Sequence, residues 1–276
     1  MVKVLAPAKL NLSLDIVGTR TDGYHLLQTV MKTISLFDTV RLEKSDNISI
    51  KCNWEDVPTD SKNLCYKAAE LFFKTTGISG GVAITLEKQI PFGAGLGGGS
   101  SDAAATLKGL DKLYKTNMSP NELAACGIKI GADVPFFFYG KTALVEGIGE
   151  KYTLLNDFMD CWFVVIKPKL FISAAEAYIA FDKFKKIKRS NTESIVDAIN
   201  RRDLNLFCQN AGNVLEEAVD KPEVWSIKNR LNEFGAKYSA MTGSGSAVFG
   251  IFASKELADS AALHFEKDDM EAFVCK

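Results

Sequence analysis

A glycine-rich stretch in the middle of the chain has the composition of a phosphate-binding loop. Five of the seven residues at positions 93–99 are glycine. Residues 82–86 before it alternate apolar side chains as a strand does, and from about Ser100 the apolar residues recur at helical spacing. Glycines let backbone N–H groups approach an anion, and a helix N-terminus carries roughly half a positive charge. The order strand, glycine loop and helix start therefore predicts a cradle for phosphate groups.

Other uses of a glycine run fit the neighbouring residues less well. Flexible linkers are rich in serine and are not flanked by regular structure. A dinucleotide-binding loop needs an acidic residue at the end of a second strand, whereas Asp111 falls on the predicted helix. A Walker loop needs a lysine after its last glycine, and here Ser100 and Ser101 follow instead. The cation for the phosphates must therefore come from another part of the chain.

The composition is that of an ordinary soluble protein with one or two domains. The chain has 276 residues, of which 47% are hydrophobic and 24% are charged, and its formal net charge is −1. This charge gives no electrostatic reason to expect nucleic-acid or membrane partners. No apolar run reaches the roughly 18 residues of a membrane span, and the apolar part of the N-terminus is short for a secretion signal. We expect a cytoplasmic protein.

The cysteines and histidines argue against two common kinds of site. The six cysteines are scattered and form no C-x-x-C pair, so we expect reduced thiols. The two histidines, His25 and His264, cannot build a histidine-rich metal centre, and neither lies near the nucleophile motif of a hydrolase.

The first half of the chain mixes strands and helices. Apolar and polar residues alternate over positions 9–16, which predicts a strand with one face in the core and one polar face. A turn through Asp22 and Gly23 ends this strand. A capping box at Ser119 and Glu122 begins a helix that should run to about residue 130. Further strands are predicted at 29–36, 39–43, 47–52, 136–139 and 143–145, and a further helix at 62–75.

The second half has the element order of a ferredoxin-like sandwich. Residues 146–160 are rich in turn formers and lack periodicity, so we place a domain junction there. Collapsing the helices that follow leaves the order β-α-β-β-α-β. The strands are predicted at 161–166, 237–241, 247–252 and 272–275, with several helices up to about 234 and one at 255–266. The basic run Lys183, Lys185, Lys186, Lys188 and Arg189 is predicted as a solvated helix end.

Three separate segments together resemble the GHMP kinases, which phosphorylate small molecules such as galactose, homoserine, mevalonate and phosphomevalonate. They are PAKLNL at 7–12, PFGAGLGGGSS at 91–101 and TGSGSA at 242–247. The segment RTDGYH at 20–25 resembles the branch of this family whose acceptor is a cytidine diphosphate-linked methylerythritol of the non-mevalonate route to isoprenoids. The resemblance covers essentially the whole chain.

The resemblance implies an α+β fold with two domains. Residues 1–155 would form an ATP-binding domain like the second domain of ribosomal protein S5, and residues 156–276 a ferredoxin-like domain, with the active site in the cleft between them. The implied reaction moves the γ-phosphate of ATP, accompanied by Mg²⁺, to the 2-hydroxyl of the erythritol unit. The implied state is a monomer or weak homodimer without nucleic-acid or membrane partners.

The family's catalytic residues map onto two positions. Asp133 matches the aspartate that acts as base for the acceptor hydroxyl, and Lys9 matches its partner lysine, whose charge would neutralise the transferred phosphoryl group. Without the resemblance, an aspartate before Val-Pro such as Asp133 is more often a turn residue, and Lys9 would be a solvated strand residue. A set this sparse suffices because phosphoryl transfer needs mostly positioning and charge stabilisation.

The family's binding residues map onto further positions. Tyr24, His25 and Tyr178 would hold the cytidine, since aromatic faces stack on bases and an imidazole bonds their edges. The whole expected ATP-binding set is Pro91, Phe92, Gly93, Ala94, Gly95, Leu96, Gly97, Gly98, Gly99, Ser100, Ser101, Asn63 and Leu64, and the acceptor set is Asn11, Tyr24, His25, Tyr178, Gly243 and Gly245. No metal ligand is assigned, and Ala174 stands where many relatives have threonine.

Several of these residues also have plainer interpretations. Asn63 and Leu64 are equally a helix cap and a core residue, and Gly243 and Gly245 equally a tight turn between strands. Two alternative functions stay open: another GHMP kinase, of the homoserine or mevalonate type, and a non-catalytic nucleotide-binding module. The DGYH sequence argues against the first, and the presence of both Asp133 and Lys9 argues against the second.

Overall fold

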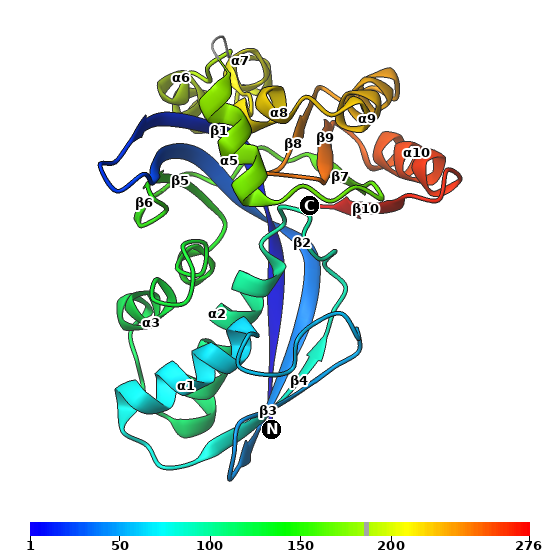
Figure 1. The fold of residues 1–276 in the computed structure, drawn as a ribbon. Coiled ribbons are helices and arrows are strands. Elements are labelled where there is room, and N and C mark those ends of the chain that lie inside the picture. The colour runs from blue at the N-terminus through cyan, green and yellow to red at the C-terminus, as the bar shows by residue number, and fades with distance from the viewer. Residues whose placement is uncertain (185–187) are drawn as a thin grey trace. The chain divides into compact units, whose positions relative to one another are not determined.

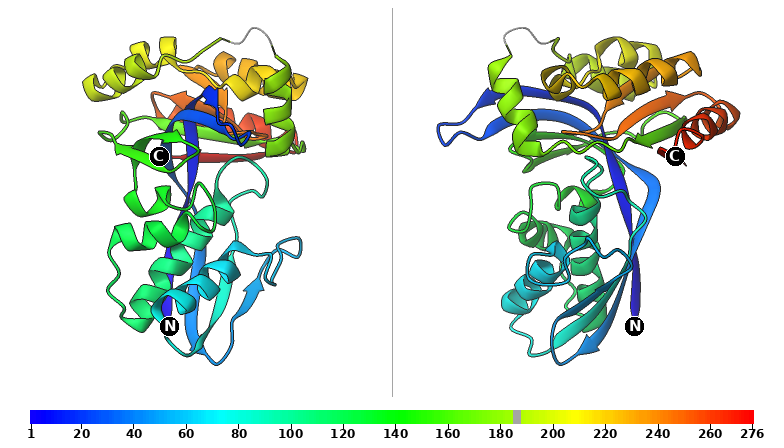
Figure 2. Two further views of the ribbon diagram at one scale, coloured as in Figure 1. Left: turned by 60° about the vertical axis from the view of Figure 1, so that its left-hand side comes forward. Right: turned by 45° about the vertical axis from the view of Figure 1, so that its right-hand side comes forward.

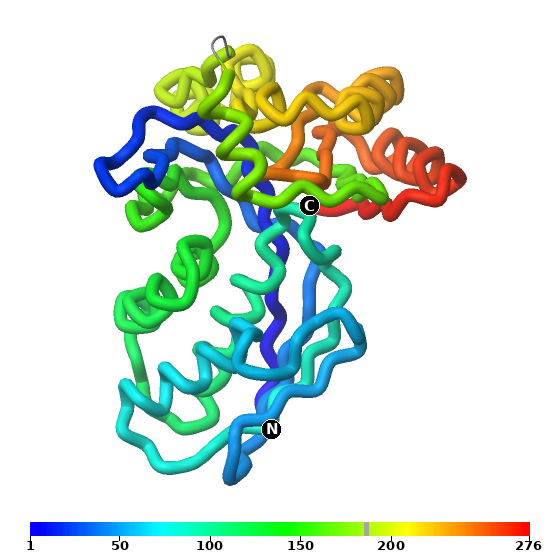
Figure 3. Tube along the Cα trace, in the orientation of Figure 1, coloured from blue at the N-terminus to red at the C-terminus, as the bar shows by residue number. Residues whose placement is uncertain are grey.

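The computed structural model describes residues 1–184 and 188–276, so Lys185 and Lys186 of the basic run lie outside the described residues. Figure 3 traces the chain. The strands are β1 (Val2–Thr19), β2 (His25–Ser45), β3 (Ser49–Cys52), β4 (Gly81–Glu87), β5 (Thr142–Gly147), β6 (Lys151–Leu154), β7 (Trp162–Lys167), β8 (Tyr238–Met241), β9 (Val248–Phe252) and β10 (Glu271–Cys275). The helices are α1 (Leu64–Thr76), α2 (Gly98–Tyr114), α3 (Pro120–Gly127), α4 (Phe136–Tyr139), α5 (Ala174–Lys183), α6 (Thr192–Arg201), α7 (Leu204–Asn210), α8 (Val214–Val219), α9 (Pro222–Glu233) and α10 (Lys255–Glu266).

These elements form two compact units that interleave along the chain. Unit 1 comprises Met1–Ala8, Leu36–Phe92 and Gly97–Gly140, and unit 2 comprises Lys9–Ser35, Gly93–Leu96 and Lys141–Lys276. The long strands β1 and β2 contribute residues to both units. The mixed α/β architecture with two sheets confirms the predicted α+β class. The division into residues 1–155 and 156–276 stays a prediction.

In unit 1, part of the six-stranded sheet carries the two helices that flank the glycine loop in sequence. β4 pairs antiparallel with the C-terminal part of β2 and parallel with β3. Helices α1 and α2 pack against each other on this sheet (Figure 1). The approach of α2 to the sheet needs Gly109, because a Cβ there would collide with Leu42 and lie 3.3 Å from Val4. The glycine loop therefore leads directly into a 17-residue helix that is packed closely on the sheet.

Unit 2 contains the ferredoxin-like sheet that the element order predicted. Its strands run in the order β10-β7-β9-β8 and all pair antiparallel. Helices α9 and α10 cover one face of this sheet (Figure 2), where Val164 and Phe252 meet Leu231 and Phe265. The opposite face carries Phe163, which belongs with an aromatic cluster.

In unit 2, the N-terminal part of β2 pairs with β5, and β5 pairs with β6.

The first strand differs from its prediction in one respect. The polar face of β1 was expected to be solvated, but Lys9, Asn11, Ser13 and Asp15 are all at most 4% exposed. Both faces are buried because other segments of unit 2 supply hydrogen-bonding partners for this face, as described below.

Other local predictions were wrong or incomplete. Residues 136–139 form helix α4 rather than a strand, since a short apolar run cannot by its pattern distinguish the two and Pro135 caps a helical turn. The strands expected at 29–36 and 39–43 are one continuous strand, β2. All six cysteines are free thiols, as expected. In the described part of the chain, no helix is both long and apolar enough to cross a membrane.

Candidate active site

The glycine loop has the backbone conformation that only glycine adopts easily. Gly93, Gly95 and Gly97 have φ angles of 62°, 76° and 71°. Gly98 differs from them, because it is the first residue of α2 and its φ is not positive. Along the chain, the loop begins in unit 1, passes through unit 2 as Gly93–Leu96 and returns to unit 1 at Gly97.

In unit 2, the loop is bonded to the first and third motifs. Leu96 O accepts from Lys9 N at 2.9 Å, and Ala94 O accepts from Ala247 N at 3.1 Å. A Cβ on Gly95 would collide with the carbonyl oxygen of Thr242, so these backbones approach each other only because residue 95 is glycine. The structure thus brings together three segments that are far apart in the sequence.

The catalytic lysine candidate lies within this meeting point. Lys9 Nζ donates to Asn11 Oδ1, and Asn11 Nδ2 donates to Thr29 Oγ1 at 2.8 Å. Thr242 Oγ1 accepts from Asn11 N at 2.9 Å. A Cβ on Gly243 would lie 3.2 Å from Asn11 Oδ1 and 3.5 Å from Lys9 Nζ. Asn11 Oδ1 thus orients the Lys9 ammonium group, and the predicted contact of Asn11 with the acceptor stays a prediction.

Buried polar residues that the sequence analysis did not identify form hydrogen bonds to the third motif and to Met241, which precedes it. Asn213 Nδ2 donates to Met241 O at 2.7 Å and to Gly243 O at 2.8 Å. Glu216 Oε2 accepts from Met241 N at 2.6 Å and pairs with Lys228. Burial raises the pKa of Glu216, and the Lys228 ammonium group opposes that effect. In the sequence, the local feature that could indicate such a role is the position of Asn213 directly before α8, where an asparagine can cap the helix.

The predicted cytidine residues His25 and Tyr178 lie together in unit 2. Their rings stack with centroids 5.0 Å apart and planes 19° apart, and Phe181 meets the His25 ring edge-on. His25 Nε2 lies 2.7 Å from Asp182 Oδ1. Tyr178, Phe181 and Asp182 all come from α5, which Ser173 caps and which begins at Ala174. Tyr24 stands apart as an exposed side chain of the hairpin turn, 62% accessible.

In unit 1, the helix that follows the loop begins without a side-chain cap. Its N-cap residue is Gly97, which makes no side-chain hydrogen bond to the helix end. The first-turn N–H groups of a 17-residue helix thus combine with the positive end of its dipole. A Cβ on Gly99 would lie 3.7 Å from Leu64 Cδ1. Asn63 caps α1 by accepting from Cys65 N at 2.8 Å, which is the plainer of its two predicted roles.

The aspartate expected to act as base lies in a turn. Asp133 is half-buried in the segment between α3 and α4, where Val134 N donates to Gly131 O at 3.1 Å. Asp133 belongs to unit 1 and Lys9 to unit 2. Their pairing stays a prediction.

The comparisons with known proteins agree with these motifs. The models of the GHMP kinase N-terminal and C-terminal domains match residues 63–141 and 195–270. A Clostridium tetani protein named 4-diphosphocytidyl-2-C-methyl-D-erythritol kinase is 45% identical over 278 residues, covering 100% of this chain and 99% of its own. The chain belongs to the GHMP kinase family.

Solved structures of GHMP kinases share this architecture. A crystal structure of 4-(cytidine 5′-diphospho)-2C-methyl-D-erythritol kinase matches with a TM-score of 0.83 at 34% identity and covers 99% of this chain and 98% of its own. A homoserine kinase from Cytophaga hutchinsonii matches with a TM-score of 0.81 at 21% identity, covering 99% of this chain and 93% of its own, which speaks for the fold alone. This GHMP kinase is therefore an enzyme, and its family uses ATP.

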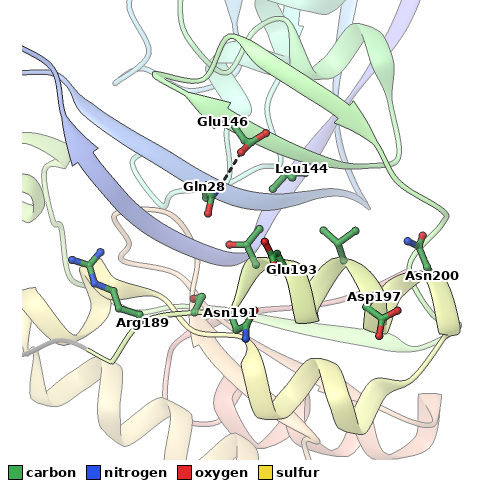
Figure 4. A pocket seen from close by; sticks show the side chains of 11 residues that line it. Gln28, Leu144, Glu146, Arg189, Asn191, Glu193, Asp197 and Asn200 are labelled. Atoms are coloured by element: carbon green, nitrogen blue, oxygen red, sulfur yellow. Dashed lines mark hydrogen bonds between the residues drawn. The ribbon is translucent and has the colours of Figure 1, made fainter.

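One sizeable pocket of this GHMP kinase lies apart from the predicted residues. It has a volume of 810 Å³ in unit 2, and Gln28, Glu146, Arg189 and Glu193 are among its lining residues (Figure 4). Gln28 donates to Glu146 Oε1 at 2.9 Å. Because neighbouring side chains of a strand point to opposite faces, Gln28 faces away from the side on which Thr29 contacts Asn11. None of the predicted site residues lines this pocket.

Proposed function

We propose that this GHMP kinase transfers the γ-phosphate of ATP to the 2-hydroxyl of 4-diphosphocytidyl-2-C-methyl-D-erythritol, a step of the non-mevalonate route to isoprenoids. The observation that carries this proposal is the stacked pair of His25 and Tyr178. The two residues come from distant segments, and the resemblance assigns both to the cytidine end of the acceptor. Relatives 43–46% identical to this chain carry the name of that kinase.

The cytosine ring would be recognised by stacking and by its edge. His25 and Tyr178 are in direct ring contact, so the base would stack on an outer face of the pair rather than between the rings. The Asp182 carboxylate accepts from His25 Nε2, which leaves Nδ1 of the neutral ring as an acceptor. That nitrogen suits the exocyclic amine of cytosine, which is a hydrogen-bond donor.

The phosphates of ATP would lie against the glycine loop. The helix start at Gly97 offers N–H donors and a positive dipole, and Lys9 is a buried cation whose backbone N–H bonds to the loop at Leu96. Asn11 and Thr29 hold the lysine in one orientation, so its charge is already in place when negative charge develops.

The chemical step would need one proton acceptor. The acceptor hydroxyl oxygen attacks the γ-phosphorus, the bond from that phosphorus to the bridging oxygen of ADP breaks, and Asp133 takes the hydroxyl proton. Lys9 would offset the charge on the transferred group. Both assignments rest on the match of these positions to the family's motifs.

Magnesium would arrive as part of the nucleotide. Among the described residues, no three His, Cys, Asp or Glu side chains group together as a metal cage. This fits Mg²⁺, which keeps several waters and is usually bound through substrate phosphates with one or two protein carboxylates. No protein ligand and no step is assigned to the metal.

A single assay tests the choice of acceptor. ADP release is measured with 4-diphosphocytidyl-2-C-methyl-D-erythritol, homoserine or mevalonate as the acceptor. We expect turnover with the cytidine compound. Turnover with homoserine or mevalonate instead would replace the proposed substrate, and no turnover with any of them would favour a nucleotide-binding module.

A further inference from the structure

A buried cluster of three charged side chains lies where the two ends of the glycine loop meet in unit 1. Asp38 comes from β2, Lys88 follows β4, and Asp102 is in the first turns of α2. Their side chains are 1%, 4% and 4% exposed. Lys88 Nζ donates to Asp38 Oδ2 and, at 2.6 Å, to Asp102 Oδ2. The ammonium group of Lys88, before the loop, thus bonds to Asp102, after the loop, and to Asp38 of β2.

The segment that leads into the loop is held along its backbone. Asp38 Oδ1 accepts from Gln89 N at 2.6 Å and from Ile90 N at 2.8 Å. Asn53 Oδ1 accepts from Lys88 N at 2.7 Å, and Asn53 Nδ2 donates to Lys88 O at 3.2 Å. The three residues before Pro91 are therefore fixed at four backbone atoms.

The helix that follows the loop lies directly against this segment. A Cβ on Gly98 would lie 3.1 Å from Ile90 Cγ2 and 3.3 Å from Lys88 Nζ. Such distances are tighter than ordinary van der Waals contact, so α2 begins this close to Lys88 because residue 98 is glycine. Asp102, one turn further along α2, adds the charged contact to the same lysine.

The cluster is costly for a feature that merely fills the core. Buried ions lose their hydration, and replacing a buried ion pair by apolar residues is often neutral or stabilising. Here two carboxylates share one ammonium group, and Asp102 Oδ1 and the neighbouring Ser101 Oγ have no hydrogen-bond partner among the described residues. What the charges do supply is a fixed geometry, since each contact is directional and links a different segment.

We propose that Asp38, Lys88 and Asp102 form a positioning cluster that holds the two ends of the glycine loop together, so that the N–H groups at the start of α2 keep the geometry needed by the phosphates of ATP. The inference rests on the proposed role of the loop. None of the three residues needs to touch the nucleotide. Their effect is on binding and alignment, because a displacement of about 1 Å in a site can cost about 10²-fold in rate.

The test compares two substitutions of one residue. Asp102→Ala removes the contact from α2 to Lys88 but leaves the lysine paired one-to-one with Asp38, so the fold keeps a balanced charge pair. Asp102→Asn keeps an oxygen acceptor of the same size facing Lys88. We expect Asp102→Ala to raise the KM for ATP by about tenfold or more with little change in the acceptor KM, and Asp102→Asn to restore most of the wild-type value.

Two further variants make the outcome specific. Lys88→Met should raise the KM for ATP as Asp102→Ala does, because both break the same link. Arg41→Met, which breaks the half-buried Arg41–Glu87 pair of the same sheet, should change neither KM. If Asp102→Ala and Asp102→Asn are equally active and melt alike, or if Lys88→Met leaves the KM for ATP unchanged in a folded protein, the cluster does not position the loop.

The variant Gly97→Val distinguishes a failure of the cluster proposal from a failure of the proposed role of the loop. That substitution puts a branched side chain at a φ of 71° in the loop. If Gly97→Val raises the KM for ATP and the Asp102 variants do not, the cluster proposal alone fails. If Gly97→Val also leaves ATP binding unchanged in a folded protein, the loop does not hold the phosphates.

Discussion

Truncation of Tyr178 to alanine should weaken binding of the acceptor without affecting ATP. The His25 and Tyr178 rings are 5.0 Å apart and nearly parallel, so a cytosine base has two outer faces on which to stack. Stacking of a base on an aromatic side chain is worth about 1–3 kcal/mol. If the base lies on Tyr178, the acceptor KM should rise roughly five- to 140-fold, since 1.4 kcal/mol is tenfold.

Stacking of the base on His25 instead predicts a smaller rise in the acceptor KM. If the base lies on His25, Tyr178→Ala removes only the ring that supports His25, and a pair of aromatic rings is worth about 0.5–1.5 kcal/mol. The acceptor KM should then rise roughly two- to twelvefold. A rise of more than about twelvefold would therefore indicate that the base lies on Tyr178, and a rise of less than about fivefold that it lies on His25.

The assay measures the KM for each substrate and kcat, for the wild type, Tyr178→Ala and Tyr178→Phe. The phenylalanine variant keeps the ring and should retain an acceptor KM well below that of the alanine variant. Thermal denaturation controls for loss of fold, because Tyr178 also packs against the core of unit 2. A raised KM for ATP with a normal acceptor KM would refute the assignment of these rings to cytidine.

Three further predictions concern unit 1. Asp133→Asn should remain folded and bind ATP but lose about 10²–10⁴ in kcat, and near-normal turnover would remove Asp133 from the mechanism. Gly98→Val should weaken ATP binding and stability together, because its Cβ would lie 3.1 Å from Ile90 Cγ2; a stable variant with normal ATP affinity would contradict this packing. Burial, with a further contribution from Asp38, raises the pKa of Asp102 from 3.8 to about 7 while Lys88 opposes the rise, and the Cys65 thiol nearby stays neutral because burial also raises its pKa. Between about pH 4 and 7 Asp102 is ionised in the unfolded chain but keeps its proton in the folded protein, so the free energy of unfolding falls as the pH rises. The urea midpoint of the wild type should therefore fall with rising pH relative to that of Asp102→Asn. Parallel curves for the two proteins would disprove this prediction.

Local sequence pattern predicted the elements and the motifs that depend on neighbouring residues. The strand before the glycine loop, the capping box at Ser119 and the four strands of the ferredoxin-like sheet are all present. The run at 136–139 was misassigned because four apolar residues fit a strand and a buried helical turn equally well. Tertiary packing decides such a segment, and pattern alone does not contain that information.

The burial of Lys9 and Asn11 shows what alternation cannot reveal. Their side of β1 is polar in sequence, which indicates solvent, yet Thr29 and Thr242 cover it and satisfy its hydrogen bonds. Thr29 does not stand out in the sequence, and the third motif includes Thr242 without indicating its partner, because each role depends on a residue from a distant segment. The candidate catalytic residues were predicted by motif, and the residues that contact them became visible only in three dimensions.

The glycines themselves have two purposes that the sequence could not separate. Absence of a side chain predicts room for an anion, and the start of α2, where Gly97 provides no side-chain cap, is consistent with that. Gly95 and Gly98 are needed for another reason, since a Cβ on the first would collide with Thr242 and on the second would crowd Ile90. In each unit a glycine of the loop therefore allows another segment to approach and hold it. Because such a loop is fixed by its neighbours, we expect its affinity for phosphate to depend as much on Thr242 and Lys88 as on the glycines.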